Sequence, residues 1–458
     1  MSTRIKSKST DLTEGGIAPL LLRFALPILV GQIFQNLYNS VDSIVVGQFV
    51  GTSALAAVTS SGDISNLLVA FFTGLSAGAG VLFSRFYGAK DQKNLHDAIH
   101  TALTFSCLLG AAMAAVGVLV APGLLRLVSC PEEVYLEARL YLRIYLCGIL
   151  FTAIYNVGAG VLRAVGDSRD PFLYLVIASL TNMALDVLLV AGLHMGVMGV
   201  AVATVCSQFL SVVLVFRNML RTEDVYKVRV RDLRIDRALL VQIIDLGLPA
   251  GIQSCIISIS NFFIQRFVNM AGPVAMGGIG SAKKLDRFAG IIANSMGLAT
   301  ATFVSQNVGA KRMDRAFRGS HVSLGITCAI SGVMCVLLYV FAERAVSLFT
   351  PNREAVAYGA AMLRVMMPFY LLQILNAIYS NVVRGFGRSR AVMVLSILGM
   401  AGCRQLFLQL TMARHFDVNN IYYGYPVGWG CASLFVIVYY LITIVLPYRR
   451  KKAAGESA

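Results

Sequence analysis

Long apolar stretches separated by short charged segments dominate the chain. Five of them contain no Asp, Glu, Lys or Arg and reach about 20 residues, the length that a helix needs to cross a bilayer: Ala98–Ala121, Met195–Phe216, Phe288–Ala310, Val365–Val383 and Ile421–Tyr448. Allowing isolated polar residues adds seven more, near residues 17–46, 51–84, 137–162, 171–193, 238–270, 319–342 and 391–413. The pattern predicts an all-α membrane protein with twelve transmembrane helices.

The second half of the chain repeats features of the first at an interval of about 221 residues. The repeated pieces are LeuPro (26–27 and 248–249), GlyAlaLys (88–90 and 309–311) and VLRAVGDSR with VVRGFGRSR (161–169 and 382–390). Two pseudo-symmetric lobes of six helices each are therefore expected. The predicted division is a cytoplasmic N-terminal segment (1–16), a first lobe (17–218), a cytoplasmic connector (219–237), a second lobe (238–447) and a basic cytoplasmic tail (448–458).

Composition and charge agree with a membrane protein. Hydrophobic residues make up 57% of the chain and charged residues only 14%, against about 25% in soluble domains. The net charge of +16 would suggest nucleic acid in a soluble protein, but the basic residues gather in alternate loops, which places both termini and the connector in the cytoplasm. We expect a multi-pass protein of the plasma membrane, with the lipid bilayer as its surroundings, no nucleic acid and no obligate protein partner.

The sequence lacks the motifs that are typical of several kinds of functional site. The nine cysteines form no CxxC pair, and no phosphate-binding P-loop is present. His96 and His100, four residues apart, favour an interfacial polar pair over a metal site. The N-terminus shows no apolar core followed by a cleavage site, so no removable signal peptide is expected. These observations predict a protein that is not an enzyme and has no cofactor and no firm metal site.

Acidic residues at membrane depth are the first functional candidates, because a charge in hydrocarbon is costly. Asp42, Asp63 and Asp186 lie roughly 7, 16 and 10 Å inside the outer ends of their spans, at a rise of about 1.5 Å per residue. Asn182 precedes Asp186 by one helical turn, and Thr204 lies at a comparable depth. We expect these five side chains to meet in one polar pocket in the outer half of the first lobe.

The repeat supplies an internal control for this pocket. At the aligned positions of the second lobe, Asp42 becomes Ile264, Asp186 becomes Phe407, Asn182 becomes Cys403 and Asp63 becomes Lys284. Side chains that only held the fold together would be expected in both lobes. The asymmetry favours binding of a cation or protons in the first lobe, whereas the alternative is that Asn182 and Asp186 only satisfy interhelical hydrogen bonds.

Two further features concern the helices themselves. Pro27 and Pro249 fall at equivalent places in the first span of each lobe, where each is either a hinge or a fixed bend. Lys284, Asp286 and Arg287 enter the eighth span about 16 Å below its outer end. A contact of Lys284 with Asp286, or with an acid of the opposite lobe, would offset part of the cost of burying these charges.

The stretches ALPILVGQIFQNLYNSVDSIVVGQFVGTSALAAV (25–58), GLSAGAGVLFSRFYGAKD (74–91) and MGLATATFVSQNVGAK (296–311) resemble the multidrug and toxic compound extrusion (MATE) family. The resemblance extends from about residue 13 to 447. It implies two six-helix bundles in a V-shaped arrangement around a central cleft. It also implies alternating access and efflux of organic, often cationic or amphipathic, compounds in exchange for protons or sodium.

The resemblance also implies roles for single residues. Asp42 corresponds to the family's first-lobe acid, Asn182, Asp186 and Thr204 to its partners, and Tyr141 to the tyrosine beside them, although Tyr145 lies one turn away. Pro27 matches the proline at which the first span is proposed to bend.

The second lobe departs from one branch of the family. The sodium-driven NorM-like branch carries acids in spans 7 and 10, whereas here span 10 has none and span 7 has only Asp245, near its cytoplasmic end. The chain is thus more similar to the DinF-like or archaeal type, and proton coupling is the first interpretation. Sodium also stays a candidate for the coupling ion, because carboxylate, amide and hydroxyl oxygens suit a hard cation. These oxygens would come from Asp42, Asn182, Asp186 and Thr204.

A tolerant apolar cavity would suit such substrates, and Phe34, Tyr38 and Met296, with Asp63, Lys284 and Asp286, are its candidate lining residues. Three alternatives share some of the features. A flippase of lipid-linked oligosaccharides would have the same fold with a more basic cavity, a major-facilitator transporter would have other loop signatures, and a membrane prenyltransferase would need Asp-rich magnesium motifs. Of these, the flippase is the main alternative.

Overall fold

The computed structural model describes residues 10–127 and 130–455, and within them the side chains of all residues except 38–45, 52–56, 60, 63, 127 and 414. The described residues form helices and connecting loops, with no strand. Twelve helical segments are long and apolar enough to cross a membrane, and they coincide with the twelve predicted spans. The prediction of an all-α, twelve-span protein is confirmed, as expected where lipid leaves backbone polar groups no partner outside the helix itself.

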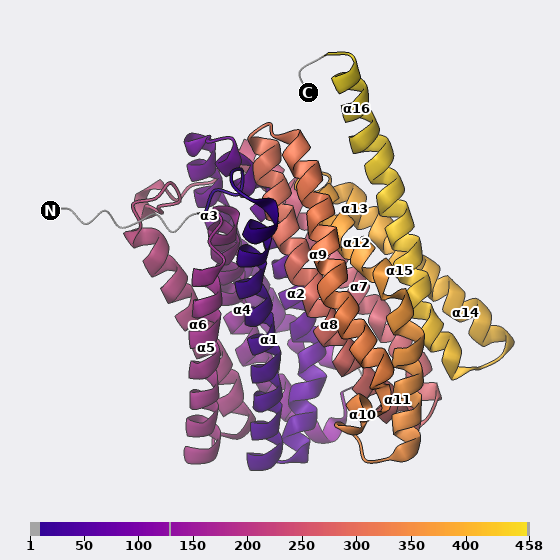
Figure 1. Ribbon diagram of the computed structural model, residues 1–458. Coiled ribbons are helices and arrows are strands. Elements are labelled where there is room, and N and C mark those ends of the chain that lie inside the picture. Colours follow the sequence, from indigo (N-terminus) through magenta and orange to yellow (C-terminus); the bar gives the residue numbers. More distant parts are fainter. Residues whose placement is uncertain (1–9, 128–129, 456–458) are drawn as a thin grey trace. The chain divides into compact units, whose positions relative to one another are not determined.

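The first compact unit comprises residues up to Asp11 and Leu26–Gly251. Its helices are α1 (Ile17–Phe49), α2 (Thr52–Gly88), α3 (Gln92–Leu127), α4 (Tyr135–Ala164), α5 (Arg169–Asp186) and α6 (Gly196–Arg221), with the short segments η1 (Glu132–Val134), η2 (Val187–Gly192) and η3 (Val230–Asp232). Helix α4 packs against α2, α3 and α6 (Figure 1). Phe83, Ile99, Leu162 and Val215 join these four helices in one apolar core.

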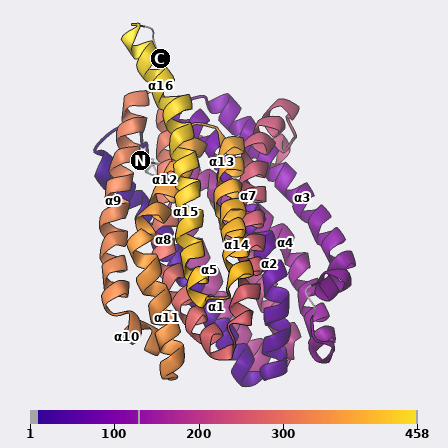
Figure 2. The ribbon, with the colours of Figure 1, turned by 90° about the vertical axis from the view of Figure 1, so that its right-hand side faces the viewer.

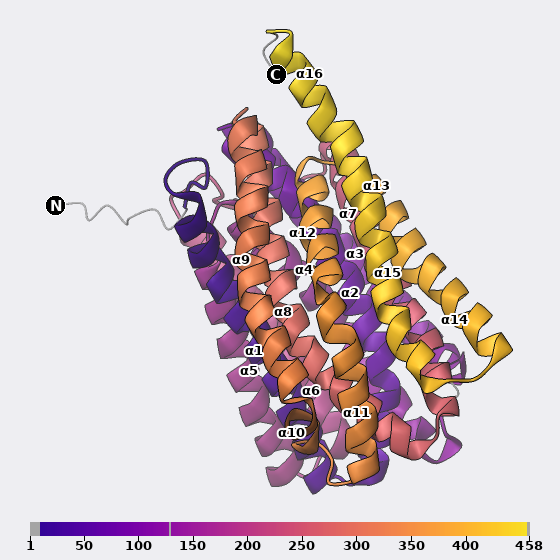
Figure 3. The ribbon, with the colours of Figure 1, turned by 45° about the vertical axis from the view of Figure 1, so that its right-hand side comes forward.

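The second unit comprises Leu12–Ala25 and the chain from Ile252 onward. Its elements are α7 (Arg237–Met270), α8 (Pro273–Gly309), α9 (Met313–Val340), α10 (Ala342–Ser347), α11 (Arg353–Met366), η4 (Met367–Phe369), α12 (Tyr370–Gly385), α13 (Ser389–Ser396), η5 (Ile397–Cys403), α14 (Arg404–Arg414), α15 (Val418–Tyr440), η6 (Leu441–Val445) and α16 (Leu446–Ala453). Helix α8 packs against α9, α11 and α12 (Figure 3), and α15 runs beside α14 (Figure 2).

The two units divide inside helices rather than in loops. The boundaries fall between Ala25 and Leu26 in α1 and between Gly251 and Ile252 in α7. Both lie within three residues of a proline inside the helix, Pro27 or Pro249. Each of these helices therefore starts in one unit and continues in the other, at a point where proline removes a backbone hydrogen bond. The lobe limits given above from the sequence stay a prediction.

The repeated GlyAlaLys motif has a conformational explanation. Lys90 and Lys311 both adopt φ of 57°, one residue after the capping residues of α2 and α8. The left-handed conformation ends a helix and lets its last carbonyl groups accept turn hydrogen bonds. The amide of Lys90 donates to the carbonyl of Tyr87 and that of Lys311 to the carbonyl of Val308. The motif thus makes the same turn before α3 and before α9.

A short segment before α1, residues 10–16, belongs with this second turn, and we call it the N-terminal arm. The amide of Leu12 donates to Oε1 of Gln306 at 3.0 Å. Arg312 donates to the carbonyl of Thr13 at 2.6 Å, and Arg315 donates to that of Glu14 at 2.9 Å. The arm is therefore held by the end of α8 and the start of α9.

Close packing of α2 on the first part of α7 leads to a stability prediction. A Cβ added at Gly78 would clash with the carbonyl oxygen of Leu246, whereas one added at Gly62 of the same helix meets no atom. Gly78→Ala is expected to destabilise the protein by about 1–3 kcal/mol through overpacking. Thermal unfolding in detergent, followed with a thiol-reactive dye, would show a lower midpoint for Gly78→Ala than for Gly62→Ala. Equal midpoints would contradict the packing described.

Candidate functional site

Two polar residues are buried near the end of α5. Asn182 and Asp186 are each 1% exposed and lie one helical turn apart, on the same face. Neither the oxygen nor the nitrogen of the Asn182 amide has a hydrogen-bond partner among the described residues. Asp186 is followed directly by η2, a π-helical turn, and such turns are frequent at functional sites. A buried amide of this kind is available to a ligand.

Tyr141 and its neighbours build the wall beside this face. Tyr141 and Tyr145 of α4 are both buried, with stacked rings 6.0 Å apart. They pack in one apolar cluster with Val46 of α1, Val190 of η2 and Val200 of α6. The cluster therefore brings α1, α4, α6 and the end of α5 together at one level of the first unit.

Thr204 and Asp42 each lie four residues from a valine of this cluster. Thr204 is buried one turn after Val200 and donates to the carbonyl of Val200 at 3.0 Å. Asp42 lies in α1, four residues before Val46. The side chain of Asp42 lies outside the described residues. We call Asp42, Tyr141, Asn182, Asp186 and Thr204 the first-lobe polar site.

The predicted lining residues are spread over both units. Phe34 is 38% exposed and meets Phe172 edge-on, with ring centroids 6.4 Å apart. Met296 of α8 is buried, at 2% exposure. Pro27 lies inside α1, next to the boundary between the units. The side chains of Tyr38 and Asp63 lie outside the described residues.

The charged residues of α8 differ in their exposure and in their contacts. Lys284 is exposed, and its Nζ lies 5.5 Å from the ring centroid of Phe349. No ion pair joins Lys284 to Asp286 among the described residues; Asp286 is half-buried, and its Oδ1 has no hydrogen-bond partner there. Lys283, one residue earlier, donates instead to Oε1 of Gln265 at 3.2 Å.

Lys283 and Arg404 are not among the site residues predicted from the sequence. Arg404 is 2% exposed at the start of α14, in the middle of the eleventh span. An arginine in the middle of an otherwise apolar span is the signal that would have found it. Its Nη2 donates to Oγ of Ser260 at 2.7 Å and to Oδ1 of Asn261 at 3.1 Å.

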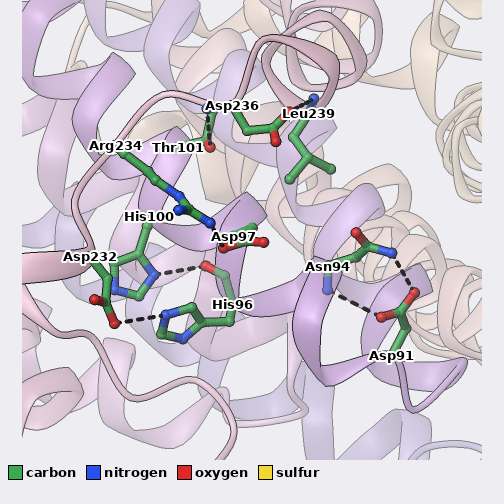
Figure 4. Close-up of polar contacts among 10 residues, drawn as sticks. All are labelled: Asp91, Asn94, His96, Asp97, His100, Thr101, Asp232, Arg234, Asp236 and Leu239. Carbon is green, nitrogen blue, oxygen red and sulfur yellow. Dashed lines mark hydrogen bonds and ion pairs between the residues drawn. The ribbon is translucent and has the colours of Figure 1, made fainter.

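The histidine pair belongs to a clamp between α3 and residues 222–236, which lie within the connector predicted at 219–237 (Figure 4). His100 meets the carbonyl of His96 through Nδ1 at 2.7 Å and accepts from the amide of Arg229 through Nε2 at 3.0 Å. His96 lies 3.2 Å from Oδ2 of Asp232. Ligand atoms of these three residues are close enough for a metal ion, but both ring nitrogens of His100 are already engaged with the backbone. The arrangement fits the polar pair expected from the sequence better than a metal centre.

Further contacts extend this clamp along the connector. Arg234 pairs with Asp97 at 3.1 Å, and the amide of Asp236 donates to Oγ1 of Thr101 at 3.1 Å. Tyr226 and Val228 are buried in the core of the first unit, and burial raises the pKa of Tyr226 to about 12.

Comparison with known proteins places this geometry in a family context. A profile of the family described as MatE matches the chain twice, at residues 27–188 and 249–408, so the match repeats as the sequence does. The probable multidrug resistance protein YoeA of Bacillus subtilis (strain 168) is 30% identical over 425 residues, covering 91% of this chain and 92% of that protein. A protein of Shewanella oneidensis named as an FAD transporter is 22% identical and covers 88% of each chain. A solved structure of a multidrug resistance MATE family transporter of the MOP superfamily, in an outward-facing conformation, aligns with a TM-score of 0.90 at 22% identity, covering 97% of this chain and 99% of that one.

Proposed function

The chain belongs to the MatE family of multidrug efflux transporters, and from that premise we propose that it is a secondary antiporter that exports organic compounds, often cationic or amphipathic, in exchange for protons. It is a multi-pass membrane transporter and not an enzyme. The proposal places it in the plasma membrane with both termini in the cytoplasm, in accord with the basic residues of alternate loops.

The observation that carries the coupling proposal is the burial of Asn182 and Asp186 on one face of α5. A carboxylate at membrane depth is costly and is retained where it binds an ion or a substrate. The amide of Asn182, which has no hydrogen-bond partner among the described side chains, would supply a second ligand oxygen one turn away. Asp42, four residues before Val46 on α1, would add a second acid to the same pocket.

In the proposed cycle, the ionised acids of the first-lobe polar site attract a cationic compound or hold the coupling ion. A proton that enters from outside neutralises the site, removes that attraction and releases the compound outward. Pro27 is the proposed hinge, because α1 passes from the second unit to the first within two residues of it. Exchange then follows from alternating access, in which proton and compound compete for one site.

Sodium is the second candidate ion. Carboxylate, amide and hydroxyl oxygens of the first-lobe polar site also match the preference of hard cations. The lack of acids between Val365 and Val383 is the reason to place protons first and to assign the chain to the DinF-like or archaeal type.

Efflux of a fluorescent organic cation from proteoliposomes tests the proposal. The wild type is expected to export the dye under a pH gradient and not under a sodium gradient. Asp42→Asn is expected to reduce the pH-driven rate at least about tenfold, because one ionised group that the proton must neutralise is gone. Efflux driven by the sodium gradient and not by the pH gradient would replace protons by sodium as the coupling ion. If neither gradient drives efflux of the dye, the antiport proposal is rejected. The protein would then be assayed as a flippase of lipid-linked oligosaccharides.

A further inference from the structure

Residues 229–237, between α6 and α7, run along the start of α3 (Figure 4). Six of their side chains are exposed and mix basic with apolar groups, and we call these six the connector strip: Arg229, Val230, Arg231, Leu233, Ile235 and Arg237. Val230 is 65% exposed, Leu233 36% and Ile235 38%. Exposed apolar side chains that gather in one short segment indicate a surface that contacts a partner or a membrane.

Contacts with α3 fix the level of the connector strip. The amide of Arg229 donates to Nε2 of His100, and the amide of Asp236 donates to Oγ1 of Thr101. These two α3 residues lie roughly 12 to 14 Å along the helix from its start, at about 1.5 Å per residue. The uncharged stretch of α3, Ala98–Ala121, begins at the same level. The strip therefore lies where charged sequence gives way to apolar sequence, which is the level of the lipid headgroups.

The three arginines of the connector strip form no ion pair within the part of the chain that the structure describes. The two acids of the segment contact other groups. Oδ2 of Asp232 lies 3.2 Å from Nε2 of His96, and Oδ1 of Asp236 accepts from the amide of Leu239 at 3.0 Å. The strip thus presents three guanidinium groups whose charge is not met by a carboxylate of the segment itself.

The two kinds of side chain together determine which partner fits. Guanidinium groups bind phosphate through two parallel hydrogen bonds, and phospholipid phosphates lie at the headgroup level. Apolar side chains between the arginines can enter the adjoining acyl region, as they do in interfacial segments of peripheral membrane proteins. A soluble anion would meet the arginines but would leave Val230, Leu233 and Ile235 in water. An anionic lipid surface matches both.

We propose that the connector strip binds the headgroups of anionic phospholipids in the leaflet that it faces. Arg229 and Arg231 contact the lipid phosphates, and Val230 lies among the upper parts of the acyl chains. The hydrogen bonds to His100 and Thr101 hold the strip at this level. The lipid site is separate from the first-lobe polar site and does not depend on the transport function proposed above.

A tryptophan reporter tests the proposal, because the chain contains a single tryptophan, Trp429, which can be replaced. Val230→Trp is made together with Trp429→Phe, and the protein is reconstituted in mixtures of phosphatidylcholine and phosphatidylglycerol. Brominated acyl chains, which quench tryptophan on contact, are carried by one lipid or by the other. The two quenching curves give the ratio of the lipid affinities at residue 230. We expect a ratio of at least about fivefold in favour of phosphatidylglycerol, the effect of one arginine at an anionic surface.

The double substitution Arg229→Gln with Arg231→Gln is expected to bring this ratio close to one. Arg450→Gln with Lys451→Gln is the matched control, because it removes two exposed positive charges from α16 and should keep the ratio of the unsubstituted strip. The proposal is overturned if neither brominated lipid quenches the tryptophan, because the strip then faces water. A ratio of one with the arginines present, or an equal fall in the control, would also overturn it.

Native mass spectrometry of the chain with its own Trp429 is the second measurement. Fewer phosphatidylglycerol molecules should stay bound to the double variant of the strip than to the α16 control, and equal numbers would contradict the proposal. If inorganic phosphate removes the lipid preference and sodium chloride of equal ionic strength does not, the strip binds a soluble phosphate, and the assignment to lipid is wrong. Both measurements are made without a pH or sodium gradient, so failure of dye efflux would reject antiport and leave the lipid site standing.

Discussion

Asp186→Asn is expected to reduce ion-coupled efflux to less than about a tenth of the wild-type rate, the effect of losing one charged interaction of about 1.4 kcal/mol or more. Asparagine keeps the shape of the side chain but can neither take up a proton nor hold a cation by charge. Because Asp186 is 1% exposed, water cannot replace the lost carboxylate. The measurement is dye efflux from proteoliposomes at several imposed pH gradients.

Asn182→Leu distinguishes a ligand-binding role from a structural one. If the amide of Asn182 contributes an oxygen to the bound ion, leucine should weaken coupling about tenfold while thermal stability stays near that of the wild type. Glu223→Gln, which removes an exposed acid that accepts a hydrogen bond from Lys227 at 2.8 Å, is the matched control for both variants. Normal coupling in Asp186→Asn and Asn182→Leu would remove the first-lobe polar site from the mechanism.

His100→Leu is expected to loosen the connector from α3. The substitution leaves the amide of Arg229 without its acceptor, and an unsatisfied backbone group of this kind costs about 1–3 kcal/mol. Amide hydrogen exchange in residues 226–232 should accelerate roughly 5- to 150-fold, since exchange in a local opening follows its free energy. Mass-spectrometric exchange on the detergent-purified protein would measure this.

The control for this effect is His321→Leu, which replaces an exposed histidine of α9. Exchange in residues 226–232 should be the same in this variant as in the wild type. If His100→Leu also leaves exchange in the connector unchanged, the burial of Tyr226 and Val228 holds the segment alone, and the hydrogen bonds of the clamp contribute little.

The spans could be predicted from the sequence because crossing a bilayer requires a length of apolar residues that is visible locally. Which face of a helix meets which neighbour is not visible locally, and two lysines of α8 show the difference. Lys283 and Lys284 are adjacent in sequence but point about 100° apart around α8, so only the packed structure separates the half-buried lysine from the exposed one. The π-helical segment η5 before Arg404 also shifts the helix phase away from the regular period.

The first-lobe polar site was more accessible to sequence reasoning. Asn182 and Asp186 follow helical spacing within one uninterrupted helix, α5, and both side chains are buried. The division of α1 and α7 between two units could not be predicted in this way. Some contacts join residues that are far apart in the chain, such as Gly78 with Leu246 and Leu12 with Gln306. The periodicity of the sequence does not predict such contacts.

The N-terminal arm has a consequence for how the chain is made. Its partners Gln306, Arg312 and Arg315 are synthesised almost three hundred residues after it. At about 5–20 residues per second, the arm waits on the order of 15 to 60 s at the ribosome and the insertion machinery before they appear. The first unit is likewise complete only when the chain has grown to Gly251. Neither unit can therefore finish folding as its own half emerges, and the second closes around one of the earliest pieces of the chain to be made.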